Sequence, residues 1–223
     1  MTGVAERLTA VRSRIEAACV RAGRAPDSVV LVAVSKLQPA SAVREAYEAG
    51  QRVFGENYVQ ELADKARSLE DLHDLRWHFI GHLQRNKAKD VVRVAHCVET
   101  LDSVRLAEAL ASRASERGRP LEVLLQVNVA REPQKAGCAP EAVPEFVAAV
   151  RALDALRLRG LMTVPPASDD PDDARPHFRA LRALAEAQGL PVLSMGMSAD
   201  LEAAIEEGAT VVRVGSAIFG RRG

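Results

Sequence analysis

Short apolar segments rich in β-branched residues alternate with amphipathic segments along almost the whole of this 223-residue chain. Such segments are typical of strands buried on both faces of a parallel sheet, and the amphipathic segments between them supply the helical crossovers. The pattern predicts eight strands. Their expected ranges are residues 29–36, 52–56, 77–81, 96–100, 121–129, 156–164, 192–196 and 211–215.

Helices are predicted before the first strand and between the strands. Apolar residues spaced by three or four, from Val4 to Ile15, indicate an amphipathic helix that ends near Gly23. Pro39 is expected in the first turn of the helix after the first strand. Asp102 is expected to cap the helix after the fourth strand.

Eight strands with interleaved helices favour an α/β fold, a single (β/α)8 TIM barrel with an extra N-terminal helix. An open doubly wound sheet is the alternative. The chain is 48% hydrophobic, which is enough for one large core, and barrels of this size are commonly a single domain. We therefore expect one domain over residues 1–223, without an interdomain linker.

The charge balance argues against two classes of partner. The chain carries 30 basic and 30 acidic side chains, whereas nucleic-acid binders and anionic-membrane binders need a basic surplus. No apolar stretch approaches the length of a membrane span, and the N-terminus lacks the apolar core of a signal peptide. Cys19, Cys97 and Cys138 are widely spaced, which suggests reduced, buried thiols in a cytoplasmic protein.

Lys36 is the residue that most suggests a function. It stands where the first predicted strand leads into a loop, and parallel α/β folds bind their ligands at this end of the strands. An amine in such a place can lose its proton when desolvated and attack a carbonyl to form a Schiff base. The alternative is a solvated lysine at a strand terminus, and Lys36 alone does not decide between the two.

Small residues follow the last two predicted strands, where barrels often bind a phosphate. Gly215 lets the backbone approach a ligand, and Ser216 can donate through its hydroxyl and amide at the start of a short terminal helix. Ser198 either shares this role or is a plain helix cap. Asp200 is expected to face solvent, because an inward carboxylate would repel a phosphate.

Arg213 is unusual because it lies between valines in the last predicted strand. A buried guanidinium needs a partner, which is either a neighbouring acid such as Glu56 or a ligand, and its place just before Gly215 favours the ligand. Asn57 follows the second strand at the ligand-binding end. His78 is at least as consistent with a hydrogen-bonded core histidine as with a catalytic role. The histidines show no metal-ligand spacing, so no metal is expected.

A Schiff-base lysine and a phosphate site at the strand ends together suggest pyridoxal phosphate. Over nearly its whole length the chain resembles the YggS/PROSC (PLPBP) family of pyridoxal phosphate homeostasis proteins. Six ordered motifs carry the resemblance: AVSK at 33–36, FGENYVQE at 54–61, WHFIG at 77–81 with LQ at 83–84 and NK at 86–87, RGLM at 159–162, SMGMSAD at 194–200 and RVGSAIFG at 213–220.

The resemblance implies a barrel like the N-terminal domain of alanine racemase. It implies that Lys36 carries pyridoxal 5'-phosphate as an internal aldimine, with Arg213 facing the pyridine nitrogen and Asn57 near the ring. The residues implied to hold the phosphate are Ser198, Gly215 and Ser216. No catalytic residue is implied.

The implied function is buffering or delivery of the cofactor. An arginine cannot give up its proton, so a pyridine nitrogen facing Arg213 stays largely unprotonated and the ring is a weak electron sink. Racemases of this fold add a second domain that supplies an opposing base, and no such domain is expected here, because few residues follow Gly215 and Ser216.

The resemblance therefore implies a cytoplasmic vitamin B6 homeostasis protein without strong catalytic activity. Its expected partners are pyridoxal phosphate and apo pyridoxal-phosphate enzymes, with no nucleic acid and no membrane, and it is expected to be a monomer or weak dimer. One alternative is a small pyridoxal-phosphate-dependent racemase that uses Tyr58 or His78 as a base. A Schiff-base aldolase that acts on a sugar phosphate without a cofactor is the other.

Overall fold

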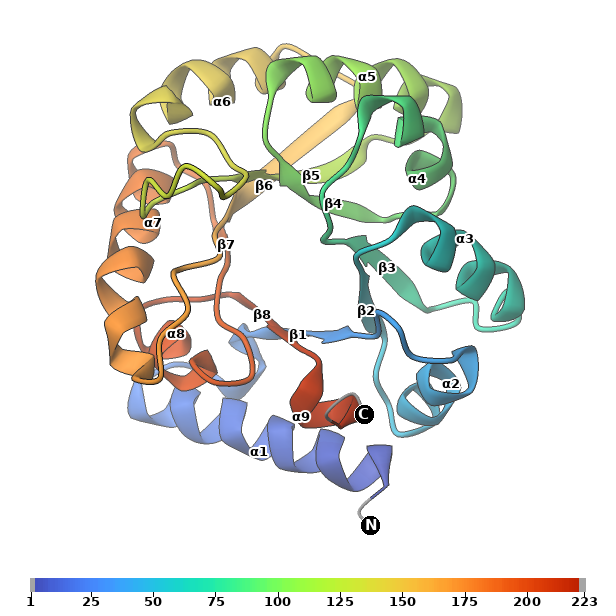
Figure 1. Ribbon diagram of the computed structural model, residues 1–223, viewed down its shortest axis with the longest axis vertical. Helices are drawn as coiled ribbons and strands as arrows, with labels where there is room; N and C mark the ends of the chain where they lie inside the picture. The colour runs from blue at the N-terminus through green and yellow to red at the C-terminus, as the bar shows by residue number, and fades with distance from the viewer. Residues whose placement is uncertain (1–2, 221–223) are drawn as a thin grey trace.

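Eight parallel strands form a closed barrel in the computed structural model, which describes residues 3–220. The strands pair in chain order, and β1 completes the ring by pairing with β8, from Val30 opposite Val211 to Ala33 opposite Val214. Figure 1 shows the strands as an inner ring with the helices outside it. The prediction of a (β/α)8 TIM barrel is confirmed, and the open sheet is excluded.

The strands occupy the predicted segments, but several end earlier than predicted. Lys36 and Gly215 lie in the loops that follow β1 and β8, beyond the regular strand backbone. The bounds are β1 Val30–Val34, β2 Val53–Glu56, β3 Arg76–Phe79, β4 Cys97–Leu101, β5 Leu121–Gln126, β6 Leu156–Met162, β7 Val192–Ser194 and β8 Val211–Val214.

The helices follow the predicted alternation, with two corrections at their first turns. Pro39 is the N-cap of its helix and not part of the first turn. Ser103, not Asp102, caps the helix after β4, because Ser103 directly precedes the first helical residue and its Oγ accepts from the N–H of Leu106 at 3.4 Å. The bounds are α1 Val4–Arg21, α2 Ala40–Glu48, α3 Val59–Ser68, α4 Ala88–Val94, α5 Val104–Ala114, α6 Val143–Arg151, α7 Arg175–Ala187, α8 Leu201–Glu206 and α9 Ser216–Phe219.

Apolar side chains form two separate cores. The larger core joins the strands to the surrounding helices and contains the fully buried Phe54, Phe79 and Phe178. The smaller core consists of Cys97, Leu124 and Met162, from the neighbouring strands β4, β5 and β6. Because this second cluster is small, it leaves room for polar side chains inside the barrel.

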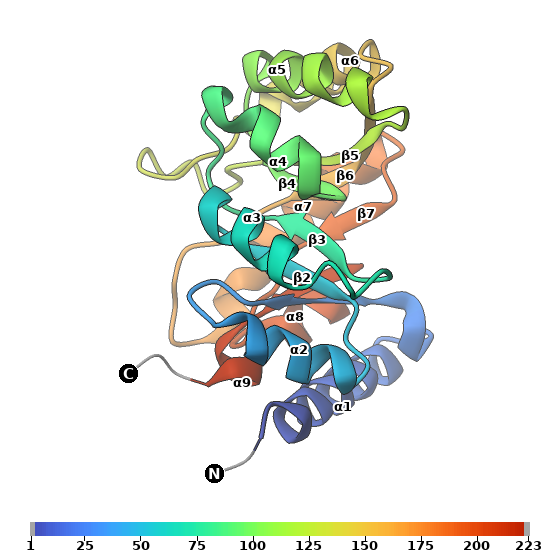
Figure 2. The ribbon, with the colours of Figure 1, turned by 90° about the vertical axis from the view of Figure 1, so that its right-hand side faces the viewer.

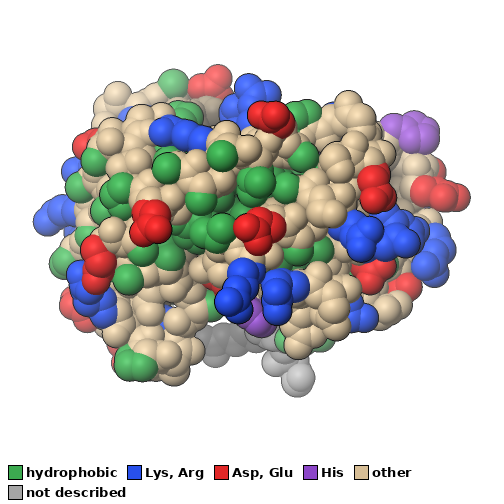
Figure 3. Space-filling model, turned by 90° about the horizontal axis from the view of Figure 1, so that it is seen from above, with side chains coloured by type: hydrophobic (Ala, Val, Ile, Leu, Met, Phe, Trp, Pro, Cys, Tyr) green, Lys and Arg blue, Asp and Glu red, His purple; other side chains and the backbone are tan. Residues whose placement is uncertain are grey.

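The extra helix α1 packs against α8 and α9 outside the barrel, as Figures 1 and 2 show. It therefore joins the beginning of the chain to elements near its end. On the face shown in Figure 3, acidic and basic side chains are interspersed, in keeping with their equal numbers. No helix within residues 3–220 is long and apolar enough to cross a membrane.

His96 will make the fold sensitive to mild acid. Its Nδ1 accepts from the N–H of Trp77 at 3.1 Å, and burial, aided by the charge of Arg119, lowers the pKa of His96 from 6.5 to about 4. Between these values the unfolded chain binds a proton that the native state does not, so stability falls as pH drops from about 6.5 to about 4.

We expect a loss on the order of 1 kcal/mol between about pH 7 and about pH 5, measured by urea unfolding. A His96→Gln variant should be less stable at the higher pH, but its stability should depend less on pH. An equal pH slope in both proteins would rule out His96 as the source.

Candidate functional site

The loops after β1 and β8 bring Lys36 beside two of the residues predicted to bind phosphate. They line a hollow of about 40 Å³ at the C-terminal ends of the strands, which is formed by Val34, Lys36, Gln38, Gly215, Ser216, Phe219 and Gly220. The lysine and the small residues come from opposite ends of the sequence. They meet because β1 pairs directly with β8.

The backbone on both sides of Lys36 is held by side chains of α3. Lys65 Nζ donates to the carbonyl of Ser35 at 2.6 Å, and the N–H of Leu37 donates to Glu61 Oε2 at 2.7 Å. Leu37 has a φ of 60°, in the left-handed region that non-glycine residues seldom adopt. These two contacts stabilise that conformation and fix the peptide groups that flank Lys36.

Glu56 and Lys65 form a buried ion pair beneath this loop. Lys65 Nζ donates to Glu56 Oε1 at 2.7 Å, and the hydroxyl of Ser35 donates to the same oxygen at 2.6 Å. Burial raises the pKa of Glu56, although both hydrogen bonds oppose the shift. Glu56 therefore forms its ion pair with Lys65. The suggestion that Glu56 is the acidic partner of Arg213 is wrong.

The two predicted serines meet at the ends of β7 and β8. Ser216 Oγ donates to Ser198 Oγ at 3.2 Å. Gly196 has a φ of 92°, and a Cβ there would lie 2.5 Å from that of Ala204, so only glycine fits. The terminal helix α9 has four residues, too few for a strong dipole. The hydroxyl pair is thus the better argument for a phosphate site.

Asp200 is buried, and the expectation that it faces solvent is wrong. Its Oδ1 accepts from the N–H of Met197 at 2.6 Å and closes the turn that carries Ser198. Burial raises the pKa of Asp200. The carboxylate turns inward because the peptide N–H needs an acceptor.

Arg213 is buried inside the barrel and has three polar neighbours. Its Nη1 donates to Ser194 Oγ at 2.6 Å, its Nη2 donates to the carbonyl of Thr163 at 2.9 Å, and Nη1 lies 3.9 Å from Glu99 Oε2. Burial lowers the pKa of Arg213, while Glu99 and Asp200 oppose this shift. A guanidinium remains charged under all physiological conditions.

His78 belongs to the same buried group, where its Nδ1 lies 2.6 Å from Glu99 Oε1. Burial alone would raise the pKa of Glu99. The hydrogen bonds from His78 and Ser194 and the charges of His78 and Arg213 outweigh burial and hold this pKa below its usual value. His78 lines a cavity of about 280 Å³ together with Val30, Val53 and Val192, which begin their strands. This is the opposite mouth of the barrel from Lys36, so the structure gives His78 a hydrogen-bonded role in the core.

Asn57 has a buried side-chain oxygen, Oδ1, with no hydrogen-bond partner within residues 3–220. Its backbone is close to Gly81, where an added Cβ would lie 2.0 Å from the Asn57 carbonyl oxygen. A buried acceptor without a partner is costly. Asn57 therefore offers an unused acceptor at the ligand-binding end of β2.

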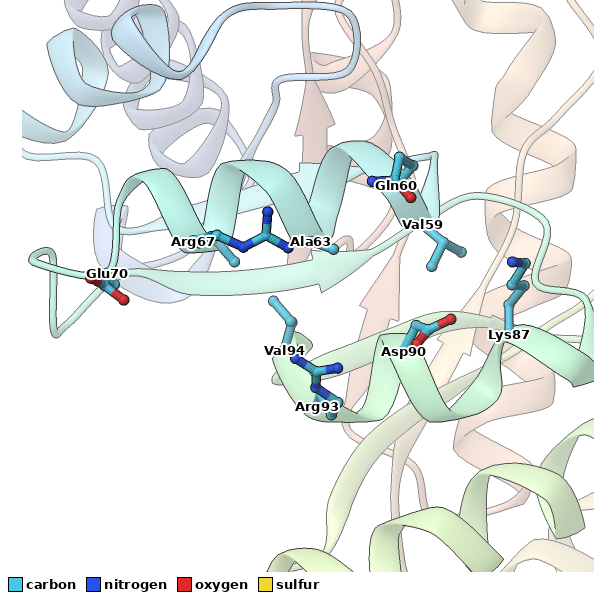
Figure 4. Close-up of a pocket in the computed structure, with 10 residues that line it drawn as sticks. Val59, Gln60, Ala63, Arg67, Glu70, Lys87, Asp90, Arg93 and Val94 are labelled. Carbon is cyan, nitrogen blue, oxygen red and sulfur yellow. The ribbon is translucent and has the colours of Figure 1, made fainter.

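A larger hollow of about 530 Å³ lies on the outside of the barrel between α3 and α4 (Figure 4). Side chains of both signs line it, among them Arg67, Asp90 and Arg93. It is formed by helix side chains, and none of the predicted site residues lines it. Volume alone therefore does not identify the functional site here.

The described part of the chain, residues 3–220, holds no cluster of three or more histidine, cysteine or acidic side chains that could bind a metal ion. Cys19, Cys97 and Cys138 are free thiols. Burial raises the pKa of Cys138 to about 11 and that of Cys97 well above its usual value. Both thiols are therefore protonated at neutral pH and are poor nucleophiles.

The sequence analysis missed Lys65, Glu99 and Ser194. Glu99 left a signal, because it is an acid in the middle of the otherwise uncharged segment from Cys97 to Leu101. Ser194 and Lys65 left none, since a serine in a short strand and a lysine on an amphipathic helix are ordinary.

The closed barrel thus places a lysine and paired serine hydroxyls at the C-terminal ends of its strands. A sequence model of the family "Alanine racemase, N-terminal domain" matches residues 7–223. The pyridoxal phosphate homeostasis protein of Pseudomonas aeruginosa is 48% identical, over 100% of this chain and 97% of its own. That of Escherichia coli K12 is 44% identical, over 100% and 98%. The chain belongs to the family of pyridoxal phosphate homeostasis proteins.

Solved structures agree with this assignment. PipY of Synechococcus elongatus, solved with pyridoxal phosphate bound, is 40% identical with a TM-score of 0.86, over 97% of this chain and 100% of its own. Alanine racemase from Streptomyces coelicolor is 24% identical with a TM-score of 0.72, over 96% of this chain and 59% of its own. The likeness to the racemase shows the shared fold alone.

Proposed function

We propose that this chain is a single barrel domain that holds pyridoxal phosphate at Lys36 and serves cofactor homeostasis in the cytoplasm, by buffering or delivery. One observation carries the proposal: Lys36, Gly215 and Ser216 line the same hollow at the C-terminal end of the barrel. The names of the curated relatives and the cofactor bound to PipY support it.

The residues present fit this cofactor. Asn57 Oδ1 is a buried acceptor without a partner among the described residues. Ser198 and Ser216 place two hydroxyls 3.2 Å apart. At Gly215 a Cβ would lie 3.1 Å from the carbonyl oxygen of Val34, so the absence of a side chain keeps this part of the hollow open. A phosphate needs such donors and close backbone approach.

Each of these residues has a distinct part in holding the cofactor. When bound, pyridoxal phosphate supplies an aldehyde that condenses with a primary amine and releases water. Lys36 would provide the amine, Arg213 would donate to the pyridine nitrogen, and Asn57 would lie near the ring. The phosphate would be held by Ser198, Gly215 and Ser216.

Arg213 supports holding the cofactor over catalysis with it. Its guanidinium keeps its proton, so the pyridine nitrogen would stay unprotonated and the ring would accept electrons poorly. His78, one candidate base for a racemase, is bonded to Glu99 and lines the opposite mouth of the barrel. Tyr58, the other candidate, is 51% exposed.

The proposal is tested by adding pyridoxal phosphate to the purified protein and recording its visible spectrum. A yellow band that borohydride bleaches is expected, and the loaded protein should restore activity to an apo pyridoxal-phosphate enzyme. A protein that stays colourless would overturn the proposal. Rapid exchange of the amino-acid α-hydrogen with deuterated solvent would instead show a racemase-like enzyme.

The helix α1 braces the proposed phosphate site from outside the barrel. Arg14 Nη2 donates to the carbonyl of Ser198 at 3.0 Å, and its Nε donates to Glu202 at 2.6 Å. Arg7 Nε donates to the carbonyl of Ile218 in α9 at 2.6 Å. Two arginines of one helix thus hold the backbones that carry both serines.

Replacing Arg14 with methionine should weaken binding of pyridoxal phosphate by about threefold to tenfold, because one hydrogen bond that positions Ser198 is lost. Binding of pyridoxal, which lacks the phosphate, should change little. Titrations of both ligands by absorbance measure this difference. Arg21→Met is the matched control, because Arg21 is on the same helix and pairs with Glu206 at 2.9 Å. Equal weakening for both ligands would contradict the bracing role.

A further inference from the structure

A line of polar groups crosses the interior of the barrel from Arg213, which is proposed to face the cofactor, to the mouth opposite Lys36. It begins at Arg213, continues through Ser194 and Glu99, and ends at His78. The successive distances are 2.6 Å, 2.5 Å and 2.6 Å. Glu99 and Ser194 are both fully buried. The function proposed above uses only the first of these four residues.

The direction of every hydrogen bond in the line follows from the chemistry of its two ends. A guanidinium only donates, and an ionised carboxylate only accepts. The hydroxyl proton of Ser194 must therefore go to Glu99, which leaves a Ser194 lone pair for Arg213. His78 must in turn carry its proton on Nδ1 and donate it to Glu99. Every hydrogen bond in the line therefore has its donor on the side away from the carboxylate of Glu99 and its acceptor on the side toward it.

Glu99 is the centre of this arrangement because it is a fixed negative charge in the barrel interior. Both of its oxygens are engaged, one by His78 and the other by Ser194. A buried arginine without a counter-charge is costly, and Glu99 Oε2 lies 3.9 Å from Arg213 Nη1. Asp200, the other acid that acts on Arg213, is already engaged with the N–H of Met197.

The carbonyl of Thr163, the second group that holds the guanidinium of Arg213, is itself fixed in place. Thr163, whose carbonyl accepts from Arg213 Nη2, donates its own hydroxyl to the carbonyl of Val127 at 2.8 Å. Its N–H donates to the carbonyl of Ser194 at 3.1 Å. The guanidinium is therefore held at two points, of which only Ser194 depends on a side chain that could rotate.

We propose that Glu99 is a positioning residue for cofactor binding. It orients the Ser194 hydroxyl, and Ser194 in turn fixes the guanidinium of Arg213 that faces the cofactor. His78 fixes the other side of the carboxylate, because its Nδ1 is hydrogen-bonded to Glu99 Oε1. This role rests on the proposed function, since it concerns how firmly Arg213 holds the pyridine nitrogen.

The test compares Glu99→Gln, Ser194→Ala and the double variant with the wild type. Each single change should weaken binding of pyridoxal phosphate roughly tenfold, because an oriented hydrogen bond to a charged group is lost. Each should also shift the visible band of the bound cofactor. The double variant should have about the same affinity for pyridoxal phosphate as the single variant that binds it less tightly, because Glu99 acts through Ser194.

Glu122→Gln is the matched control. Glu122 lies on the neighbouring strand β5 at the mouth of the barrel, 3.7 Å from Arg76 and 3.6 Å from Arg159, and it is outside the polar line. Its substitution should leave the affinity and the band unchanged. Thermal unfolding of the cofactor-free proteins identifies any loss of fold, and Ser194→Ala, which removes a single atom, keeps the test valid if Glu99→Gln unfolds.

The two proposals fail in different ways. If the wild type forms no adduct that borohydride reduces, the proposed function fails. If the wild type forms the adduct but both single variants keep its affinity and its band, the positioning role of Glu99 is wrong. Effects that add fully in the double variant would also overturn it, because they would show that Glu99 acts independently of Ser194. A lower melting temperature with an unmoved band would indicate a merely structural role.

Discussion

Lys36→Ala will abolish covalent capture of pyridoxal phosphate. Among residues 3–220, Lys36 is the one amine that lines the hollow with Gly215 and Ser216, so the variant should show no visible band that borohydride bleaches. Mass spectrometry after reduction should find no added cofactor on the protein. Weak, reversible binding through the phosphate should remain, because Ser198 and Ser216 are untouched.

The fold should survive this substitution. Lys36 is half-buried in the loop after β1, outside the helices and strands, so the melting temperature should stay close to that of the wild type. Lys89→Ala is the control, since Lys89 is an exposed lysine on α4. If Lys36→Ala still yields a reduced adduct, another lysine is the attachment site and the proposed function must be revised.

Lys65→Met will destabilise the protein by about 3–5 kcal/mol, because it leaves the carboxylate of Glu56 buried without its cation. Glu56 is fully buried, and its Oε2 has no partner in residues 3–220 even in the wild type. The free energy of unfolding from urea titrations measures the loss. The same change removes the bond from Lys65 to the carbonyl of Ser35, so the loop of Lys36 should also loosen.

The size of this loss should depend on pH in a defined direction. Burial already raises the pKa of Glu56, and loss of Lys65 would raise it further. The folded variant then binds a proton more readily than the unfolded chain, so its stability falls as pH rises from about 5 to about 8. Adding Glu56→Met to Lys65→Met should recover much of the stability, since two apolar side chains replace the pair. A loss below about 1 kcal/mol in the single variant would contradict the account.

The order of the elements could be predicted because it depends on local patterns. Buried parallel strands are short and β-branched, and amphipathic helices repeat every three to four residues, so each segment shows its type by itself. The exact ends could not be predicted, because a strand stops where its neighbours stop. Gln126 ends β5 since the register with β6 reaches only to Met162.

Part of the candidate site could likewise be predicted from the sequence, and part of it could not. Lys36, Gly215 and Ser216 could be proposed because a barrel places all strand ends of one direction together. The contact between Glu99 and Ser194 could not, since β4 and β7 are not neighbours in the sheet and their side chains meet only across the interior. Asp200 was misjudged because the need of the Met197 amide for an acceptor appears only once the turn has its shape.

The contact of α1 with the last elements has a consequence for how the protein is made. Lys36 lies near the start of the chain, whereas Ser198 and Ser216 are near its end, and Arg14 of α1 reaches the turn of Ser198. During synthesis, the first half of the chain must therefore leave the ribosome without the partners that complete the hollow. If Lys36 holds the cofactor as proposed, closure of β1 against β8 completes the site, and we expect an unfinished chain to bind the vitamin only weakly.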